Sequence, residues 1–387
     1  MQTTTPYPRF SDEEMARRYA AVRALMLKED LDALLVYGTT SAFEAIHYLS
    51  GFAATREAIL IVPAGGEPAL FLQMYNHVPT ARRMACCSDV RWGGDNTAVT
   101  AAEHLSSQGS GIRRIGLAGQ IPFQHYEALR RQLPRVTLVD VSTQFMRLRL
   151  VKSEEEIAFL RTGAELSDRV MVALEQEARP GLTEHDLVSI IEGAYLPLGG
   201  RTHIHYLVTT PMQNPAACVP AQYPSWRRLE QGDVLLTEIS AQYCPGYPGQ
   251  ILRPFTIAAP PTAGYQRLYD IAVEVFQRIA GVIRAGASSD AVLDEAEFIH
   301  KQGLTIYDDL VHGFGGGYLP PILRTRRTGS RGAPPFIFEK NMTVVIQPNV
   351  ITEDERMGVQ VGELVRVTSS GVESLHRYPM RFVRCAP

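Results

Sequence analysis

The sequence lacks the features that would direct the chain to nucleic acid, to a membrane or to a disulfide-stabilised fold. Its 38 Lys and Arg residues do not outnumber its 41 Asp and Glu residues, so no basic face for a phosphate backbone is expected. No run of about 18 apolar residues, the length of a membrane helix, occurs. The five cysteines are odd in number and show no C-x-x-C spacing. We therefore expect a cytoplasmic protein with no nucleic-acid or membrane partner.

The length of the chain and its first 150 residues indicate an α/β domain followed by a second domain. At 387 residues the chain exceeds the size at which one hydrophobic core stops growing. Ser11 and Glu14 form a capping-box pattern that predicts a first helix up to Lys28. Buried-strand patterns follow at 33–37, 58–62 and 68–72, and helical segments alternate with strands. We place the domains at residues 1–150 and 151–387.

The second half carries a pattern that occurs twice. A capping box at Ser153 and Glu156 opens a long amphipathic helix, which ends at 179–181. The sequences RPGLTEHDLV (179–188) and RAGASSDAV (284–292) share the same succession of helix end, glycine and helix start. We therefore expect a duplicated helix-helix-strands unit. Chance similarity between two helix ends is the alternative, because Gly, Ser and Thr occur at many such joints.

Several segments in a fixed order resemble one protein family. They are IHYLSGF (46–52), GDVLLTEISAQYCPGYPGQILRPF (232–255), HGFG (312–315), MTVVIQP (342–348) and VGELVRVTSSGVESL (361–375). This order is similar to that of the pita-bread family, which includes methionine aminopeptidase, aminopeptidase P, prolidase and creatinase. The resemblance implies an α/β N-terminal domain of the creatinase type, followed by an α+β pita-bread domain.

The resemblance also implies where metal ligands would stand. In the metallopeptidase members, two aspartates, one histidine and two glutamates hold two metal ions. The matching positions here are Glu238, Gln250, His312, Gln347 and Gly362. Two adjacent divalent cations need roughly four carboxylates, whereas this set retains one carboxylate and one imidazole. We therefore predict a member that has lost most of its dinuclear ligands and uses no metal and no cofactor.

The preferred functional hypothesis is a metal-independent, creatinase-like hydrolase or lyase. In it, Glu238 and His312 move protons on a small carboxylated, nitrogen-containing substrate. Creatinase uses a histidine just upstream of the GD strand, but no histidine occurs between His205 and His300. His205 is therefore the expected replacement, from the strand THIHYLV. His203 would face the same side of that strand and contact substrate, or else be an ordinary packed histidine.

Further residues are expected to bind the substrate. Arg324 stands twelve residues after His312, where creatinase-like members have an arginine that grips the substrate carboxylate. The alternative is that the Arg-rich segment 322–335 is a solvated surface loop. Neutral amides could serve as preorganised donors in the same cavity, and two tyrosines could line it. The residues expected in these roles are Gln250, Gln347, Tyr247 and Tyr318.

The resemblance extends to the assembly of the protein. Phe52 and Arg56 resemble the N-terminal loop that creatinase-type dimers insert into the partner's cavity, which implies a homodimer whose N-terminal domains cap the sites. A surface loop with an exposed arginine is the alternative. Two other functions stay open. One is a non-catalytic pseudoenzyme that binds a ligand or protein through the old cavity. The other is a single-metal Xaa-Pro-type peptidase that uses Glu238, His312 and Glu363.

Overall fold

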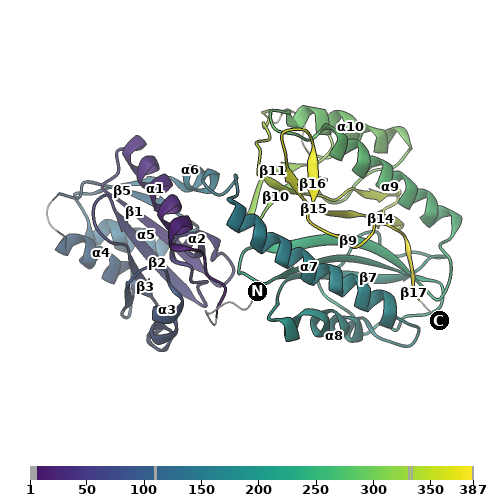
Figure 1. Cartoon of the computed structure of the whole chain (residues 1–387), viewed down its shortest axis with the longest axis horizontal. Helices are drawn as coiled ribbons and strands as arrows, with labels where there is room; N and C mark the ends of the chain where they lie inside the picture. Colours follow the sequence, from purple (N-terminus) through teal and green to yellow (C-terminus); the bar gives the residue numbers. More distant parts are fainter. Residues whose placement is uncertain (1–6, 109–110, 330–331, 333, 386–387) are drawn as a thin grey trace. The chain divides into compact units, whose positions relative to one another are not determined.

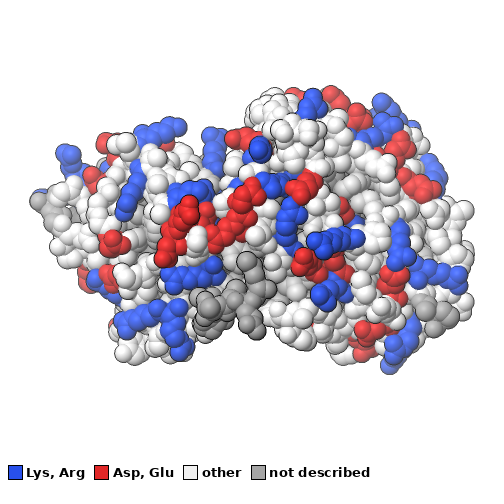
Figure 2. All heavy atoms as spheres, in the orientation of Figure 1, with Lys and Arg blue, Asp and Glu red and all other residues white. Residues whose placement is uncertain are grey.

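The computed structural model describes residues 7–108, 111–329, 332 and 334–385. Contacts between residues divide the chain into two compact units, Met1–Arg149 and Leu150–Pro387. Figure 1 shows the first unit in purple to blue and the second in teal to yellow, and each is built around its own sheet. No helix in the described ranges is long and apolar enough to cross a membrane. Figure 2 shows basic and acidic side chains interspersed over one face.

The first unit is built on a six-stranded mixed sheet with the order β4-β3-β2-β1-β5-β6. The β1-β2 and β2-β3 pairs are antiparallel, whereas β1-β5, β3-β4 and β5-β6 are parallel. The strands are β1 (Ala33–Thr39), β2 (Glu57–Pro63), β3 (Ala69–Leu72), β4 (Asp89–Trp92), β5 (Arg114–Ala118) and β6 (Thr137–Asp140). The helices are α1 (Asp12–Lys28), α2 (Glu44–Ser50), α3 (Val78–Met84), α4 (Thr97–Ser107), α5 (Phe123–Gln132) and α6 (Ser142–Arg147), with a 3₁₀ turn η1 (Tyr75–His77).

Both faces of this sheet are buried. Successive strand residues point to opposite sides, and the side chains on each side pack in an apolar cluster. On β1, Leu34 and Val36 belong to one apolar cluster with residues of α1, α2, α3 and α6. Ala33, Leu35 and Tyr37 belong to a second cluster with residues of α4 and α5. The predicted α/β unit is therefore confirmed, and so is its first helix, where the Ser11 side chain accepts a hydrogen bond from the backbone N–H of Glu14.

The second unit is built on a nine-stranded sheet whose main path runs β11-β10-β12-β15-β9-β8-β7. In addition, β16 pairs with β15 and β17 pairs with β9. The strands are β7 (Arg201–Pro211), β8 (Asp233–Gln242), β9 (Pro248–Ile257), β10 (Val311–Phe314), β11 (Tyr318–Leu323), β12 (Thr343–Ile346), β15 (Gly362–Val367), β16 (Val372–Ser374) and β17 (Val383–Cys385). A separate two-stranded sheet contains β13 (Asn349–Ile351) and β14 (Gly358–Gln360).

The helices of this unit occur as two pairs, and each pair precedes a set of strands. The first pair is α7 (Glu154–Glu177) and α8 (Glu184–Tyr195), followed by the 3₁₀ turn η2 (Leu196–Leu198), and the second is α9 (Ala263–Val282) and α10 (Ser289–Lys301). Reciprocal capping boxes start α7 at Ser153 and α8 at Thr183, which confirms the predicted helix starts. The expected repetition of helix, helix and strands is therefore present in the element order.

Helix α7 lies directly on the backbone of β9. A Cβ atom on Gly249 would be 2.2 Å from the Cα of Ala164, and one on Gly163 would be 2.7 Å from the backbone nitrogen of Gly249. Only glycine at both positions permits this approach. The Ser167 hydroxyl then donates to the carbonyl oxygen of Gly249 at 2.6 Å. The contact fixes the strand that carries Gln250, which is the next residue.

Strand pairing brings the candidate site residues to one face of the sheet. Gln250 on β9 lies opposite Ser240 on β8, and Glu238 is two residues from Ser240, so Glu238 and Gln250 share a face. His312 on β10 lies opposite Val345 on β12. Gln347 is two residues beyond Val345 and follows the end of β12. The same alternation therefore places Gln347 on the face that carries His312.

Candidate functional site

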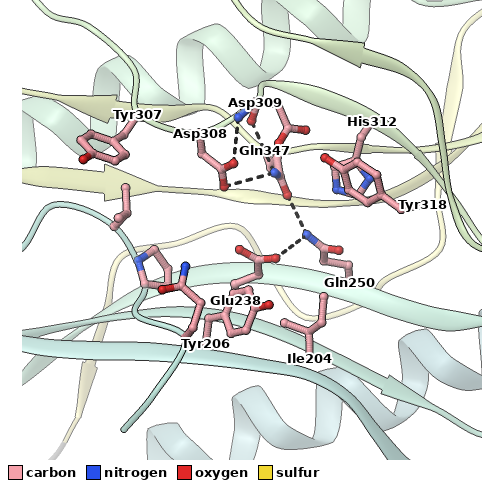
Figure 3. A pocket seen from close by; sticks show the side chains of 13 residues that line it. Ile204, Tyr206, Glu238, Gln250, Tyr307, Asp308, Asp309, His312, Tyr318 and Gln347 are labelled. Carbon is pink, nitrogen blue, oxygen red and sulfur yellow. Dashed lines mark hydrogen bonds between the residues drawn. The ribbon is translucent and has the colours of Figure 1, made fainter. Parts of the chain in front are cut away.

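A cavity of about 460 Å³ opens among these strands. Figure 3 shows Glu238 and Gln250 facing Asp308 and Gln347 across it, with His312 and Tyr318 at one side. The lining residues are Ile204, Tyr206, Val219, Pro220, Gln222, Glu238, Gln250, Tyr307, Asp308, Asp309, His312, Tyr318 and Gln347. The structure therefore brings together five residues expected from the sequence, namely Glu238, Gln250, His312, Tyr318 and Gln347.

Glu238 is a buried carboxyl group that is protonated at neutral pH. Its side chain is 8% exposed, and burial raises its pKa to about 8, with a further contribution from the charges of Asp308 and Asp309. Nε2 of Gln250 donates to Oε1 of Glu238 at 3.1 Å. A carboxyl group of this kind can give up a proton close to neutral pH.

His312 is a buried, neutral imidazole. The residue is 1% exposed, and burial lowers its pKa to about 4. Its ring stacks on that of Tyr318 with the centroids 4.4 Å apart, and it meets Phe314 edge to face at 5.2 Å. The expectation of an imidazole in the cavity together with Glu238 therefore agrees with the geometry. At neutral pH, however, His312 carries no charge that could offset a carboxylate.

Asp308 and Asp309 line the cavity but were not expected from the sequence. Asp308 accepts hydrogen bonds from the backbone N–H of Asp309 at 2.8 Å and from Nε2 of Gln360 at 3.2 Å. Burial raises the pKa of Asp308 to about 6, and the charge of Asp309 contributes. The available signal in the sequence was a pair of adjacent acids four and three residues before His312. Asp308 and Asp309 are not among the five ligand positions that the family resemblance assigns, so the resemblance did not predict a role for them.

Comparison with known proteins assigns the family. Residues 158–369 match the model of metallopeptidase family M24, and residues 18–151 match that of the Creatinase/Prolidase N-terminal domain. The chain belongs to metallopeptidase family M24. The predicted fold class, a creatinase-type α/β domain followed by a pita-bread domain, is thereby confirmed.

Individual relatives of this M24 protein cover nearly its whole length. A protein of Mycobacterium tuberculosis named "Probable dipeptidase PepE" is 25% identical over 97% of this chain and 98% of its own. A creatinase of Bacillus sp. is 24% identical over 96% of this chain and 92% of its own. The structure of an X-Pro aminopeptidase from Thermotoga maritima matches with a TM-score of 0.82 at 20% identity, covering 95% of this chain and 99% of its own.

These matches correct the leading functional hypothesis. A metal-independent, creatinase-like hydrolase or lyase was expected, but the matching family model is one of metallopeptidases. The relatives also include several proteins with peptidase names, among them an Xaa-Pro dipeptidase of Pyrococcus horikoshii, which is 21% identical over 68% of this chain and 73% of its own. Membership of family M24 supports an enzyme of the hydrolase class, and these relatives favour a peptidase over a metal-independent hydrolase or lyase, so the leading hypothesis is wrong.

The side chains in this M24 cavity do not fit a pair of divalent cations. Among the described residues, no group of three or more His, Cys, Asp or Glu side chains has an arrangement that could hold a metal ion. Two of the five expected ligand positions carry amides, and Nε2 of Gln250 donates to Oε1 of Gln347 at 2.6 Å. The carboxyl group at a third position, that of Glu238, is held in its neutral form by burial.

The acid next to the fifth ligand position faces away from the cavity. Glu363 lies opposite Ile251, the neighbour of Gln250, and so shares the other face of the sheet. Its carboxylate accepts hydrogen bonds from the guanidinium of Arg253 and the hydroxyl of Ser374. The alternative in which Glu363 joins Glu238 and His312 around one metal is therefore not compatible with this geometry.

The two histidines of β7 do not line the cavity. The residues of this strand that do are Ile204 and Tyr206, whereas Nε2 of His205 lies 2.9 Å from the hydroxyl of Tyr195 on α8. The expected position of His205 in the site is therefore contradicted, because its side chain faces the helix. The ring of His203 packs edge to face against Phe314 at 5.5 Å, as expected for a packed strand histidine.

Other predicted residues also lie away from the lining. The Tyr247 hydroxyl donates to Glu156 at 2.8 Å, so this tyrosine connects the residue just before β9 to the start of α7. Arg324 is exposed and donates to the carbonyl oxygen of Tyr307 at 2.7 Å. In the first unit, Phe52 is 4% exposed within an apolar cluster, whereas Arg56 is exposed. Substrate binding by Arg324 and a capping role for Phe52 and Arg56 stay predictions.

Proposed function

We propose that this protein is a peptidase that hydrolyses short peptides in the cavity that contains Glu238. The observation that carries the proposal is a pair of carboxyl groups in one cavity with different pKa values, about 8 for Glu238 and about 6 for Asp308. Environments that separate the pKa values of two acids are typical of acid and base pairs in enzymes. The volume of the cavity, about 460 Å³, lies within the range of small-ligand sites.

The two acids have complementary protonation states near neutral pH. Hydrolysis of a peptide bond requires a group that accepts a proton from water and a group that donates one to the leaving nitrogen. Between pH 6 and 8, Asp308 is ionised and can accept a proton, whereas Glu238 is protonated and can donate one. The amides of Gln250 and Gln347 lie between these acids and hold them in place: Nε2 of Gln250 donates to Glu238 and to Gln347, and Nε2 of Gln347 donates to Asp308.

The names of the relatives support the same substrate class. Proteins with this fold include a dipeptidase, an Xaa-Pro dipeptidase and an X-Pro aminopeptidase. The substrates that we propose for this chain are therefore dipeptides and tripeptides, with and without proline in the second position. His312 is proposed to orient the substrate through its neutral ring, because it stacks on Tyr318 beside both acids.

The test is a panel of dipeptides and tripeptides incubated with the purified chain, with product amino acids measured by chromatography. Each reaction is run in chelator and, in parallel, with added manganese, cobalt or zinc. We expect cleavage by the natural chain and a loss of about 100-fold or more in kcat/KM for Glu238→Gln. Glu353→Gln, which alters an exposed carboxylate, is the matched control. Cleavage of no peptide in any buffer, or full activity of Glu238→Gln, would contradict the proposal.

A further inference from the structure

The cavity carries acidic groups without a basic partner. Of the residues that line it, three are acids, namely Glu238, Asp308 and Asp309, and none is Lys or Arg. His312 adds no positive charge at neutral pH, because burial lowers its pKa to about 4. The lining of this cavity is therefore negative or neutral, and its electrostatic potential favours a ligand with positive charge.

Within this group, Asp309 has an oxygen that no protein atom satisfies. Asp309 is 8% exposed, and its Oδ2 has no hydrogen-bond partner among the described residues. The neighbouring Asp308, by contrast, accepts from the backbone of Asp309 and from the amides of Gln347 and Gln360. A buried polar atom without a partner costs free energy, so a donor from a ligand would stabilise Asp309.

The surroundings of Asp309 suit a compact cation. Tyr318 lies beside Asp309: burial raises the pKa of Tyr318, and the charge of Asp309 and hydrogen bonding to its carboxylate raise it further, while Oδ2 of Asp309 keeps no partner among the described residues. Tyr307 and Tyr318 both line the cavity, and each residue is 51% exposed. Aromatic faces next to a carboxylate bind ammonium groups by cation–π attraction as well as by charge.

We propose that Asp309, with Asp308 beside it, binds the protonated amine of a basic side chain on the substrate. This inference rests on the proposed peptidase function and names its preferred substrates as peptides that contain lysine or a similar residue. A dipeptide with neutral side chains brings one ammonium and one carboxylate, and that carboxylate meets no cation among the lining residues. A substrate with an additional ammonium group matches the charges of Asp308 and Asp309 better.

Arg324 does not change this balance of charge. Its guanidinium donates to the carbonyl oxygen of Tyr307, and Arg324 is not one of the lining residues. A divalent cation is a poorer match for the same acids, because no group of three ligands forms in the described part of the chain. An ammonium group, unlike a divalent cation, does not need a set of ligands around one point. It donates single hydrogen bonds to individual acceptors, and Oδ2 of Asp309 is one such acceptor.

The hydrolytic test compares peptides that differ only in the charge of one side chain. Lysine peptides are paired with norleucine peptides of the same sequence, and the ratio of their kcat/KM values is measured. We expect a ratio of about 10 or more for the natural chain and a ratio near one for Asp309→Asn, whereas Glu353→Gln keeps the natural ratio. Hydrolysis with equal kcat/KM values for both peptides would overturn the inference and leave the peptidase function intact.

A binding test separates the inference from catalysis. Titration calorimetry compares lysinamide, norleucinamide and Nε-acetyl-lysinamide, which share the α-amine and differ in the side-chain charge. We expect lysinamide to bind at least about 10-fold more tightly than the other two, even if no peptide is cleaved. Equal affinity of the three, or preference for lysinamide that survives in Asp309→Asn, would overturn the role of Asp309. A fourth probe, Nα-acetyl-lysinamide, keeps the side-chain ammonium and lacks the α-amine; if it does not bind, the site belongs to the α-amine and the inference is overturned.

Discussion

Gln250 and Gln347 meet amide to amide, with Nε2 of Gln250 2.6 Å from Oε1 of Gln347. The same Nε2 donates to Glu238 at 3.1 Å, and Nε2 of Gln347 lies 3.5 Å from Oδ2 of Asp308. The two amides therefore connect the two acids that we propose as proton carriers. Because both amides are neutral, they join these acids without adding further negative charge to a buried site.

The first prediction concerns the stability that this connection provides. Gln250→Leu keeps a side chain of similar size but leaves Oε1 of Gln347 and Oε1 of Glu238 without their donor. Leaving buried acceptors unsatisfied should lower the free energy of unfolding by about 1–3 kcal/mol. Urea denaturation followed by circular dichroism measures the change. Gln213→Leu, at an exposed position of the same unit, should change it little, and equal effects of the two substitutions would contradict the prediction.

The second prediction concerns metal affinity. Gln250→Glu combined with Gln347→Glu places two more carboxyl groups beside Glu238 and His312. Hard divalent cations prefer several anionic oxygens, so manganese should raise the melting temperature of this double variant more than that of the natural chain. In chelator the double variant should melt lower, because like charges are buried together. The exposed pair Gln213→Glu and Gln231→Glu is the control. A manganese effect equal to that of the natural chain would contradict the prediction.

The sequence predicted those parts of the site that depend on strand alternation. Glu238 and Gln250 come from paired strands with long buried runs, so the face that they share follows from the period of two. His205 was misplaced for a related reason. Alternation put His203 and His205 on one side of β7, but the pattern of the strand did not indicate which side faces the cavity. The pairing of β7 with β8 also shifts between Thr202 and Ile204.

The acidic part of the cavity could not be predicted in the same way. Asp308 and Asp309 precede β10 in an irregular segment, where no periodicity relates a residue to a face. Their position depends on the backbone of that segment and on the amides of Gln347 and Gln360, which come from distant parts of the chain. In the sequence, Gln347 and Gln360 also look like ordinary polar residues, because nothing there shows that their amides donate to Asp308. The structure was therefore needed to show that the cavity carries more acid than the five ligand positions suggest.

The third prediction concerns the pH dependence of stability. Glu238 has a pKa raised from 4.5 to about 8 by burial, so between these values the folded chain holds a proton that the unfolded chain has lost. The contribution of Glu238 to stability is therefore present below pH 4.5 and is lost as the pH rises to 8. The loss amounts to at most about 1.4 kcal/mol per pH unit. Glu238→Gln should thus gain stability relative to the natural chain between pH 5 and pH 8.

Unfolding free energies measured in urea at several pH values test this expectation. The matched control is Glu353→Gln, whose exposed side chain should give a difference from the natural chain that does not vary with pH. Histidines that burial keeps neutral, such as His312, act in the opposite direction, because stability from them is lost as the pH falls below 6.5. Parallel pH profiles for Glu238→Gln and the natural chain would refute the raised pKa.

The fourth prediction concerns the contact between α7 and β9. Gly249→Ala would place a Cβ atom 2.2 Å from the Cα of Ala164, so the helix and the strand must separate. We expect a loss of about 3 kcal/mol or more, or an insoluble product, as for overpacked cores. Gly193→Ala is the control on α8, where an added Cβ meets no atom within 4 Å. That substitution should stabilise the helix by up to about 1 kcal/mol.

The fifth prediction distinguishes a structural role of Glu363 from a role in the cavity. Arg253 is 0% exposed, and its guanidinium donates to Glu363 and to the carbonyl oxygens of Gly362, Tyr378 and Pro379. Arg253→Met would leave the Glu363 carboxylate buried without its cation, so we expect a loss of about 3–5 kcal/mol. Glu363→Gln keeps the shape of the side chain and should cost less.

A double-mutant cycle with Arg253→Met and Glu363→Gln measures the coupling of the pair by urea denaturation. We expect a coupling of about 0.5–3 kcal/mol, because the two side chains are in direct contact. In the peptide assay, Glu363→Gln should keep its kcat/KM within a few-fold of the natural value, since its carboxylate faces Arg253 and Ser374. A loss of activity as large as that of Glu238→Gln, with stability unchanged, would place Glu363 in the catalytic site and contradict the alternation of β15.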